Sequence, residues 1–121
     1  MYFAVIREPG PRWDHARPMR EQDGWAEHAA YIDALAAAGV VVLVGPLGDG
    51  TMLHRALLVF EADGEAAVQA RLAEDPWSPA EMLTTALLAP WHILIGDPAQ
   101  PRPDAITSPP TAATVRPSPP R

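Results

Sequence analysis

Blocks of apolar residues alternate with polar and glycine-rich segments along the first 96 residues. Apolar positions three and four residues apart are typical of an amphipathic helix, and a short apolar run bounded by turn residues is typical of a buried strand. On these criteria the chain predicts strand, helix, strand, strand, helix and strand. The expected helices are residues 24–39 and 64–74, and the expected strands are residues 2–7, 40–45, 55–62 and 90–96, with Leu83 as the earliest start of the last strand.

Two short patterns predict how the second half of the chain is capped. Asp63 precedes the second helix and is expected to be its N-cap residue, with Glu65 in the first helical turn. Ser78, Pro79 and Glu81 have the spacing of a capping box, which predicts a short additional helix before the last strand.

This order of elements predicts the fold. A βαββαβ chain is typical of the α+β, ferredoxin-like arrangement, in which a four-stranded antiparallel sheet carries both helices on one face. The other face of such a sheet is usually wet, yet residues 40–44 and 56–60 are apolar on both faces. We therefore expect a second copy of the chain to cover the open face, which makes a homodimer whose sheets pack together or join into a barrel. The alternative is that the valine-rich runs only reflect a tolerant composition.

His28 lies within the apolar stripe of the first helix, three residues after Trp25 and four before Ile32. A buried imidazole costs free energy unless a hydrogen bond satisfies it. One interpretation is a core histidine held by a backbone carbonyl. The other is a general acid or base, because the pKa of histidine is ordinarily close to neutrality.

Asp75 is the candidate partner for this histidine. It follows the second helix, where a carboxylate could orient the imidazole and stabilise its protonated form. An aspartate before a proline is also an ordinary turn initiator or helix cap, so Pro76 leaves a purely structural interpretation open.

Composition excludes several classes of function. The 121 residues suffice for one domain, and the absence of cysteine excludes disulfides, thiolate metal sites and a cysteine nucleophile. The net charge of −6 argues against a nucleic-acid partner. The histidines show no local zinc-binding spacing, so no metal or other cofactor is expected.

The chain begins in a strand-like run and has no apolar segment long enough to span a membrane, which predicts a cytoplasmic protein without a membrane partner.

The last residues have a different composition from the rest. Eight of the fifteen prolines fall within residues 97–121, which contain almost no large apolar side chain. Such a segment cannot bury enough surface to offset its ordering entropy. We predict a folded domain over residues 1–96 and a disordered, proline-rich tail over residues 97–121. Residues 8–24 form a second unusual segment, a long loop that is expected to be either a lid or disordered.

Four motifs, in this order, resemble the YciI-like (YCII-related) family of dimeric α+β barrel proteins. They are "HAAYIDALAAAG", "VVVLVGP", "LLVFEADGEAAVQARLAEDPW" and "PWHILIG". The resemblance covers residues 2–96 and implies a ferredoxin-like dimer with an active-site His–Asp pair, matched by His28 and Asp75. Members of the family often carry an arginine where this chain has Trp25. Anion recognition would then require another arginine, such as Arg20, Arg17 or Arg12, whereas an aromatic residue there suggests a more apolar ligand or a packing role.

These residues lead to two hypotheses of function. The first is a cofactor-independent enzyme of the isomerase, lyase or dehalogenase type, in which His28 and Asp75 perform acid–base chemistry on a small carbonyl- or lactone-like molecule. The second is a non-catalytic dimer that binds a small ligand or a partner. The residues expected to shape the site are Trp25, Gly45, Pro46 and Trp77; Gly45 would allow close approach of a ligand, although Gly-Pro could merely end a strand and Trp77 could simply fill the core.

Overall fold

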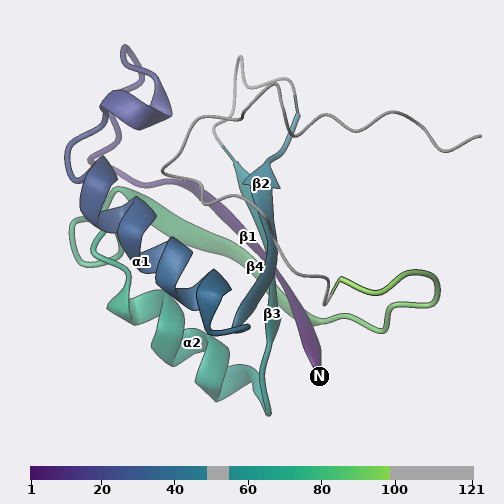
Figure 1. Cartoon of the computed structure of the whole chain (residues 1–121). Coiled ribbons are helices and arrows are strands. Elements are labelled where there is room, and N and C mark those ends of the chain that lie inside the picture. Colours follow the sequence, from purple (N-terminus) through teal and green to yellow (C-terminus); the bar gives the residue numbers. More distant parts are fainter. Residues whose placement is uncertain (49–54, 99–121) are drawn as a thin grey trace, which may run out of the picture.

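The computed structural model describes residues 1–48 and 55–98 (Figure 1). Two α-helices and a short 3₁₀ helix accompany four strands. In chain order the elements are β1 (Tyr2–Pro9), η1 (Met19–Glu21), α1 (Trp25–Ala37), β2 (Val41–Pro46), β3 (Ala56–Glu61), α2 (Glu65–Glu74) and β4 (Leu83–Pro90).

The strands form one antiparallel sheet in the order β2-β3-β1-β4. Figure 1 shows α1 and α2 side by side on one face of this sheet. This is the ferredoxin-like α+β fold that the order of elements predicts. Because β1 is central, it pairs with β3 over most of its length and with β4 on its other side.

The core lies between the sheet and the helices, and strand alternation determines which residues enter it. In β1 every second residue is buried, namely Phe3, Val5 and Arg7. Phe3 and Val5 pair with Phe60 and Leu58 of β3 across the ladder. The helices add the apolar side chains of their inner faces, which are Ile32, Leu35, Val68 and Leu72. The third inward position of β1 therefore points a charged residue into a largely apolar interior.

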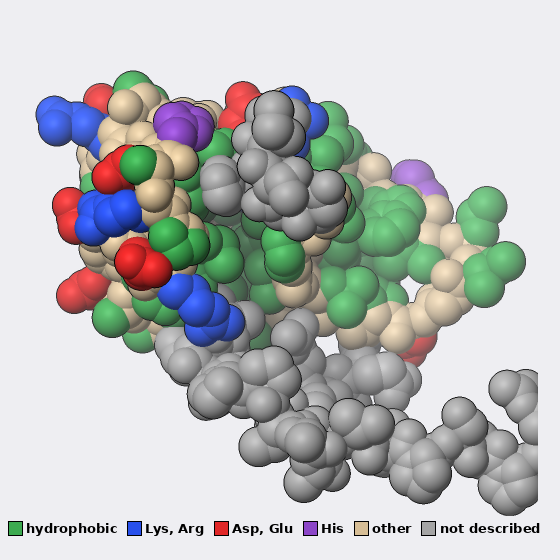
Figure 2. All heavy atoms as spheres, turned by 90° about the horizontal axis from the view of Figure 1, so that it is seen from above, with side chains coloured by type: hydrophobic (Ala, Val, Ile, Leu, Met, Phe, Trp, Pro, Cys, Tyr) green, Lys and Arg blue, Asp and Glu red, His purple; other side chains and the backbone are tan. Residues whose placement is uncertain are grey.

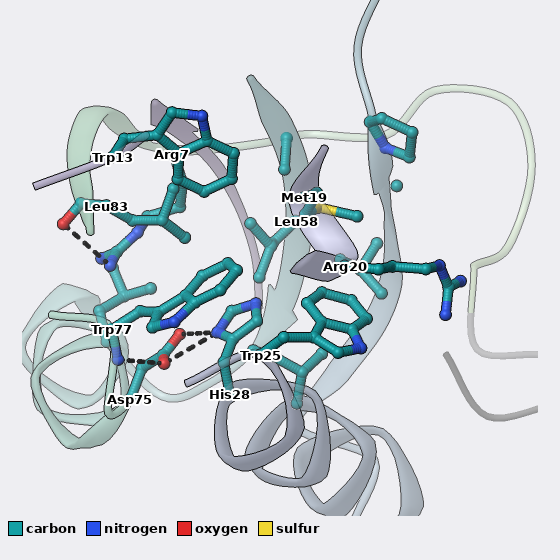
Figure 3. A pocket seen from close by; sticks show the side chains of 16 residues that line it. Arg7, Trp13, Met19, Arg20, Trp25, His28, Leu58, Asp75, Trp77 and Leu83 are labelled. Carbon is teal, nitrogen blue, oxygen red and sulfur yellow. Dashed lines mark hydrogen bonds and ion pairs between the residues drawn. The ribbon is translucent and has the colours of Figure 1, made fainter. Parts of the chain in front are cut away.

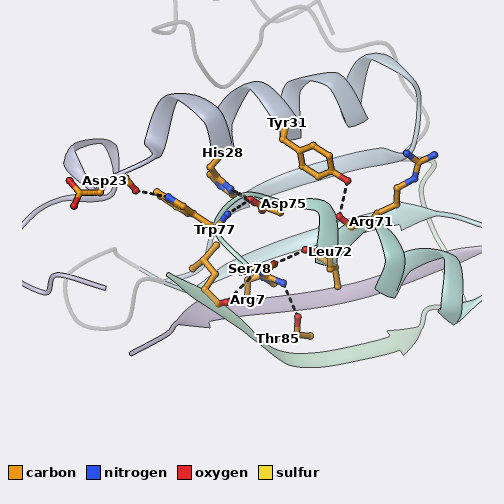
Figure 4. Close-up of polar contacts among 11 residues, drawn as sticks. Arg7, Asp23, His28, Tyr31, Arg71, Leu72, Asp75, Trp77, Ser78 and Thr85 are labelled. Carbon is orange, nitrogen blue, oxygen red and sulfur yellow. Dashed lines mark hydrogen bonds and ion pairs between the residues drawn. The ribbon is translucent and has the colours of Figure 1, made fainter. Parts of the chain in front are cut away.

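Tyr31 links the two helices. Its hydroxyl donates a hydrogen bond to the carbonyl oxygen of Arg71, at 2.8 Å (Figure 4), and the Glu74 carboxylate, at 3.2 Å, is a second acceptor within reach of the same proton. Burial, with a further contribution from Glu74, raises the pKa of Tyr31 to about 12. The folded state therefore favours the neutral phenol, and this stabilisation is lost only as the pH rises from about 10 towards 12. The link keeps the end of α2 close to α1 at neutral pH.

The expected last strand, residues 90–96, is wrong, and the strand begins instead at the earlier limit, Leu83. Pairing stops at Pro90 because its neighbour β1 begins at Tyr2, whose carbonyl accepts the last bond from Trp91. Residues beyond this point have no strand beside them in the described part of the chain. Leu94 and Ile95 are accordingly 93% and 94% exposed.

The two capping predictions are also wrong. Residues 76–82 form turns rather than a helix, because the Ser78 hydroxyl donates to the Leu72 carbonyl, at 2.6 Å, instead of capping a new helix. The N-cap of α2 is Gly64, and no side chain caps that end. Both segments still connect the predicted elements, but neither contains the predicted side-chain cap.

The long loop before α1 is folded onto the domain. Gln22, only 3% exposed, accepts a hydrogen bond from the Asp14 amide and donates to the carbonyls of Asp14 and Arg17. Trp13 is buried against Trp77. The loop therefore packs as a wall beside the first turn of α1.

The face of the sheet opposite the helices is rich in apolar residues. Ala4 and Ile6 of β1 pair there with Val59 and Leu57 of β3. Leu43 and Leu87, on the flanking strands, are both 45% exposed. Figure 2 shows charged side chains gathered on the side of the helices and loop, and mainly hydrophobic ones towards the opposite side. The apolar face that the sequence predicts is therefore present in the protomer, with Leu43 and Leu87 exposed on it and Val59 buried within it.

Two further predictions concern the proline-rich tail and membrane spans. Residues 99–121 of the predicted tail lie outside the described residues, as do residues 49–54. None of the described helices is both long and apolar enough to cross a membrane.

Candidate active site

A cavity of about 150 Å³ lies between the inner face of the sheet, α1, the loop that precedes α1 and the turn that follows α2. Its lining is mostly apolar and aromatic, and the charged or titratable side chains in it are Arg7, Arg20, His28 and Asp75 (Figure 3). The residues predicted from sequence all line this one cavity: His28, Asp75, Trp25, Gly45, Pro46 and Trp77.

His28 enters the cavity from the first turn of α1. The helix begins after Gly24, whose positive φ of 80° favours glycine, and an added Cβ there would lie 3.1 Å from Nε1 of Trp77. This start directs His28 inwards with Ala29 and Ile32, and leaves it 8% exposed.

Asp75 comes to meet His28 from the end of α2. The residue before a proline is disfavoured in helical geometry, and Asp75 is extended at φ −62° and ψ 126°. Its Oδ1 accepts a hydrogen bond from the Trp77 amide at 2.9 Å, which is the turn contact expected of an Asp-Pro sequence. Both carboxylate oxygens lie 2.9 Å from Nδ1 of His28. Asp75 therefore forms the structural turn and pairs with the histidine at the same time.

The pairing determines which imidazole nitrogen is available. An ionised carboxylate only accepts hydrogen bonds, so the proton of a neutral His28 is assigned to Nδ1, and Nε2 carries the lone pair. Figure 3 shows Nε2 on the side of the ring away from Asp75, towards Leu58 and Met19. Within the described residues no hydrogen bond occupies Nε2. The cavity thus contains a nitrogen able to accept a proton.

Indole rings hold this imidazole in place. Trp77 is stacked on His28, with ring centroids 4.0 Å apart and planes inclined by 10°. Its Nε1 donates to the Asp23 carbonyl at 2.8 Å (Figure 4), while Trp13 contacts its ring edge-on, with ring centroids 5.4 Å apart. Trp25 lies 5.8 Å from His28. Because Trp77 is 1% exposed and covers the imidazole, it supports His28 more than it offers a free stacking face.

Arg7 is a cavity residue that the sequence reasoning missed. It is 4% exposed and donates to Ser78 Oγ at 2.7 Å, Thr85 Oγ1 at 3.0 Å and the Leu83 carbonyl at 3.5 Å (Figure 4). Burial lowers the pKa of its guanidinium below the ordinary value, and the Asp75 carboxylate acts in the opposite direction. The signal was available, since the strand alternation that buries Phe3 and Val5 also points Arg7 inwards.

Of the three arginines considered as replacements for the family arginine, Arg20 lines the cavity. Its guanidinium carbon lies 5.2 Å from the centroid of the Trp25 ring, an arrangement suited to a cation–π contact. Arg17 pairs instead with Asp14 and Asp23. Arg12 lies 4.0 Å from Glu81, and neither of these two arginines lines this cavity.

Metal binding has no candidate among residues 1–48 and 55–98. No group of three histidine, cysteine or acidic side chains in these ranges is arranged to hold an ion. The polar chemistry of the cavity consists of one His–Asp pair and two guanidinium groups.

Comparisons with known proteins agree with this architecture. A family model described as "YCII-related domain" matches residues 1–92. No curated protein is significantly similar in sequence. Among solved structures, 5-chloro-2-hydroxyhydroquinone dehydrochlorinase (TftG) from Burkholderia phenoliruptrix AC1100, in complex with 2,5-dihydroxybenzoquinone, superposes with a TM-score of 0.59. The match covers 76% of this chain and 94% of that chain at 24% identity, a level at which the likeness shows a shared fold.

Proposed function

The chain belongs to the YCII-related domain family, and on this premise we propose that it is a cofactor-independent enzyme acting on a small carbonyl- or lactone-like molecule. The observation that carries the proposal is the orientation of His28. Asp75 occupies Nδ1, so the free nitrogen of a buried imidazole faces a cavity of ligand size. This is the arrangement that a general base requires.

The proposed reaction begins with removal of a proton next to the substrate carbonyl. Nε2 of His28 accepts the proton, and the electron pair of the broken C–H bond moves into the carbonyl to give an enolate. The Asp75 carboxylate, at 2.9 Å, stabilises the imidazolium that forms. Return of the proton to another carbon would complete an isomerisation, whereas expulsion of a leaving group by the enolate electrons would complete an elimination or dehalogenation.

The size of the cavity limits the substrate. A dry cavity of roughly 150 Å³ accommodates a benzene-sized molecule in other proteins. The cavity here has about this volume, and Trp25, Gly45 and Pro46 form part of its wall. We propose a single-ring substrate. The ligand of the dehydrochlorinase named above, 2,5-dihydroxybenzoquinone, is a single-ring carbonyl compound, and this supports the proposal.

Screening with single-ring ketones, quinones and lactones tests this function. Compounds that raise the melting temperature would be taken forward to turnover assays. On a substrate found in this way, His28→Ala is expected to lower kcat about 10²–10⁴-fold, because the general base is removed. His92→Ala, an exposed histidine outside the cavity, is the matched control and should keep wild-type activity.

Two outcomes of this screen would reject the enzyme mechanism. Full activity of His28→Ala would show that another group moves the proton. A compound bound equally by wild type and His28→Ala, with no product formed, would favour the second candidate, a ligand-binding dimer of the same fold. That candidate is favoured by the mostly apolar lining of the cavity, in which Trp25 occupies the position where members of the family often carry an arginine.

We also propose that the open face of the sheet binds a second copy of the chain. Burying Leu87, which is 45% exposed beside Ile6, would remove apolar surface from water. Light scattering should give twice the chain mass of 13.0 kDa for wild type, and 13.0 kDa for Leu87→Glu. Ala30→Glu, on the exposed face of α1, should remain dimeric. A wild type that elutes as a monomer at micromolar concentration would disprove this assembly.

A further inference from the structure

Arg7 is a buried cation without a carboxylate partner. Its three hydrogen bonds go to two hydroxyl oxygens and one backbone carbonyl, all of them neutral groups. The ion pairs formed by the described residues do not include it. Its Nε is fully buried and has no hydrogen-bond partner in the described structure. The guanidinium therefore keeps both a net charge and an unused donor inside the protein.

Burying such a charge is costly. A guanidinium stays protonated in proteins, so Arg7 cannot relieve the cost by losing its proton. Transfer of an ion from water to the interior is strongly unfavourable unless an opposite charge or complete hydrogen bonding compensates. Neutral hydroxyl groups supply only part of this, and Asp75, whose charge acts on Arg7, is already engaged with His28 and the Trp77 amide.

A purely structural role does not require the charge. The contacts of Arg7 connect β1 to the turn at Ser78 and to Thr85 of β4, and a neutral amide side chain could serve similar partners. The side chain also lines the cavity, in which the other cation, Arg20, lies at the opposite end (Figure 3). A ligand in the cavity would lie beside the part of the wall to which Arg7, Trp13 and Leu83 contribute.

We infer that Arg7 binds an ionised oxygen of the ligand, so the substrate class is a ring-sized molecule that carries a carboxylate or an enolate-type oxyanion. The inference extends the proposed function, since a charge at this position would also stabilise the negative oxygen that forms when His28 removes a proton. It depends on the same cavity, but it concerns binding and not turnover.

The test uses benzoate as the anionic probe and benzamide as its neutral counterpart of the same shape. Isothermal titration at pH 7 and low salt should show wild type binding benzoate at least tenfold more tightly than benzamide. In Arg7→Met the ratio should fall to about one, with the affinity for benzamide changed less than threefold. Arg71→Met, an exposed arginine outside the cavity, should keep the wild-type ratio.

Additional measurements keep the inference testable if Arg7→Met does not fold. Arg7→Lys retains the charge and should still prefer benzoate. In wild type, the Nε–H signal of Arg7 in an arginine-selective ¹⁵N spectrum should shift with benzoate and not with benzamide. Equal binding of the two probes by wild type, absence of benzoate binding at millimolar concentration, or an unmoved Nε–H signal would overturn the inference. Full activity of His28→Ala alongside an Arg7-dependent preference would reject the catalytic proposal alone.

Discussion

Asp75→Asn is expected to lower kcat by about 10⁴-fold for a substrate that binds in the cavity. A loss of this size follows when the aspartate of a catalytic His–Asp pair is replaced by asparagine in other enzymes. The amide can donate a hydrogen bond to Nδ1 of His28, which moves the ring proton to Nε2. The nitrogen that faces the cavity then carries a proton and cannot act as the base. Steady-state kinetics measure the loss, and ¹⁵N chemical shifts of the His28 ring report the change of tautomer directly.

The matched control for this variant is Asp63→Asn. Asp63 precedes α2, is exposed and caps no helix, so the substitution should leave kcat and the His28 spectrum unchanged. A wild-type kcat in Asp75→Asn would show that the pair at 2.9 Å is structural only. An unaltered His28 spectrum would show that the two side chains do not meet in solution.

Trp77→Ala should cost about 3–5 kcal/mol in the free energy of unfolding, the range observed when a large aromatic side chain is removed from a core. Trp77 is 1% exposed, contacts Trp13 edge-on and stacks on His28. Its loss also leaves the Asp23 carbonyl without its indole donor. Urea unfolding measures the effect through the midpoint and slope of the transition.

Two further tryptophan variants define what Trp77 contributes. Trp77→Phe keeps a ring against His28 and loses the bond to Asp23, so its destabilisation should be smaller than that of Trp77→Ala. Trp91→Ala removes a side chain that is 40% exposed, and its cost should stay within about 0.5 kcal/mol. If Trp77→Ala destabilised the protein as little as Trp91→Ala, the indole cluster of Trp13, Trp25 and Trp77 would not be part of the core.

The sequence predicts the fold well because the elements that determine it have strong local patterns. The apolar stripe of α1 already places His28 inside the domain, and the βαββαβ order leads to the observed sheet. The residue at which β4 ends could not be predicted from a local pattern. Pro90 ends the strand because β1 offers no further partner, and that limit is a property of the neighbouring strand.

Prediction of the site was less complete for a similar reason. His28 and Asp75 are 47 residues apart, and their contact depends on how α1 and α2 lie side by side. No local spacing contains that information. Asp75 is a candidate from its position after the second helix, and the resemblance to a family also implies the His–Asp pair. Arg7 is different, because the alternation of β1 places it inwards. It was overlooked since an arginine at the end of a strand is ordinarily exposed.

The indole cluster around His28 also gives the protein an optical reporter of its own. Three of the four tryptophans line the cavity, and two of them lie within 5.8 Å of the imidazole. A protonated imidazole in contact with an indole quenches its fluorescence, and rings this close exchange excitation energy. The emission of the cluster should therefore respond to the charge on His28 and to any molecule that enters the cavity. The fourth tryptophan, Trp91, lies outside the cavity and can be separated by its access to iodide. The intrinsic tryptophan fluorescence of the unlabelled protein is thus sufficient to follow ligand binding at the site.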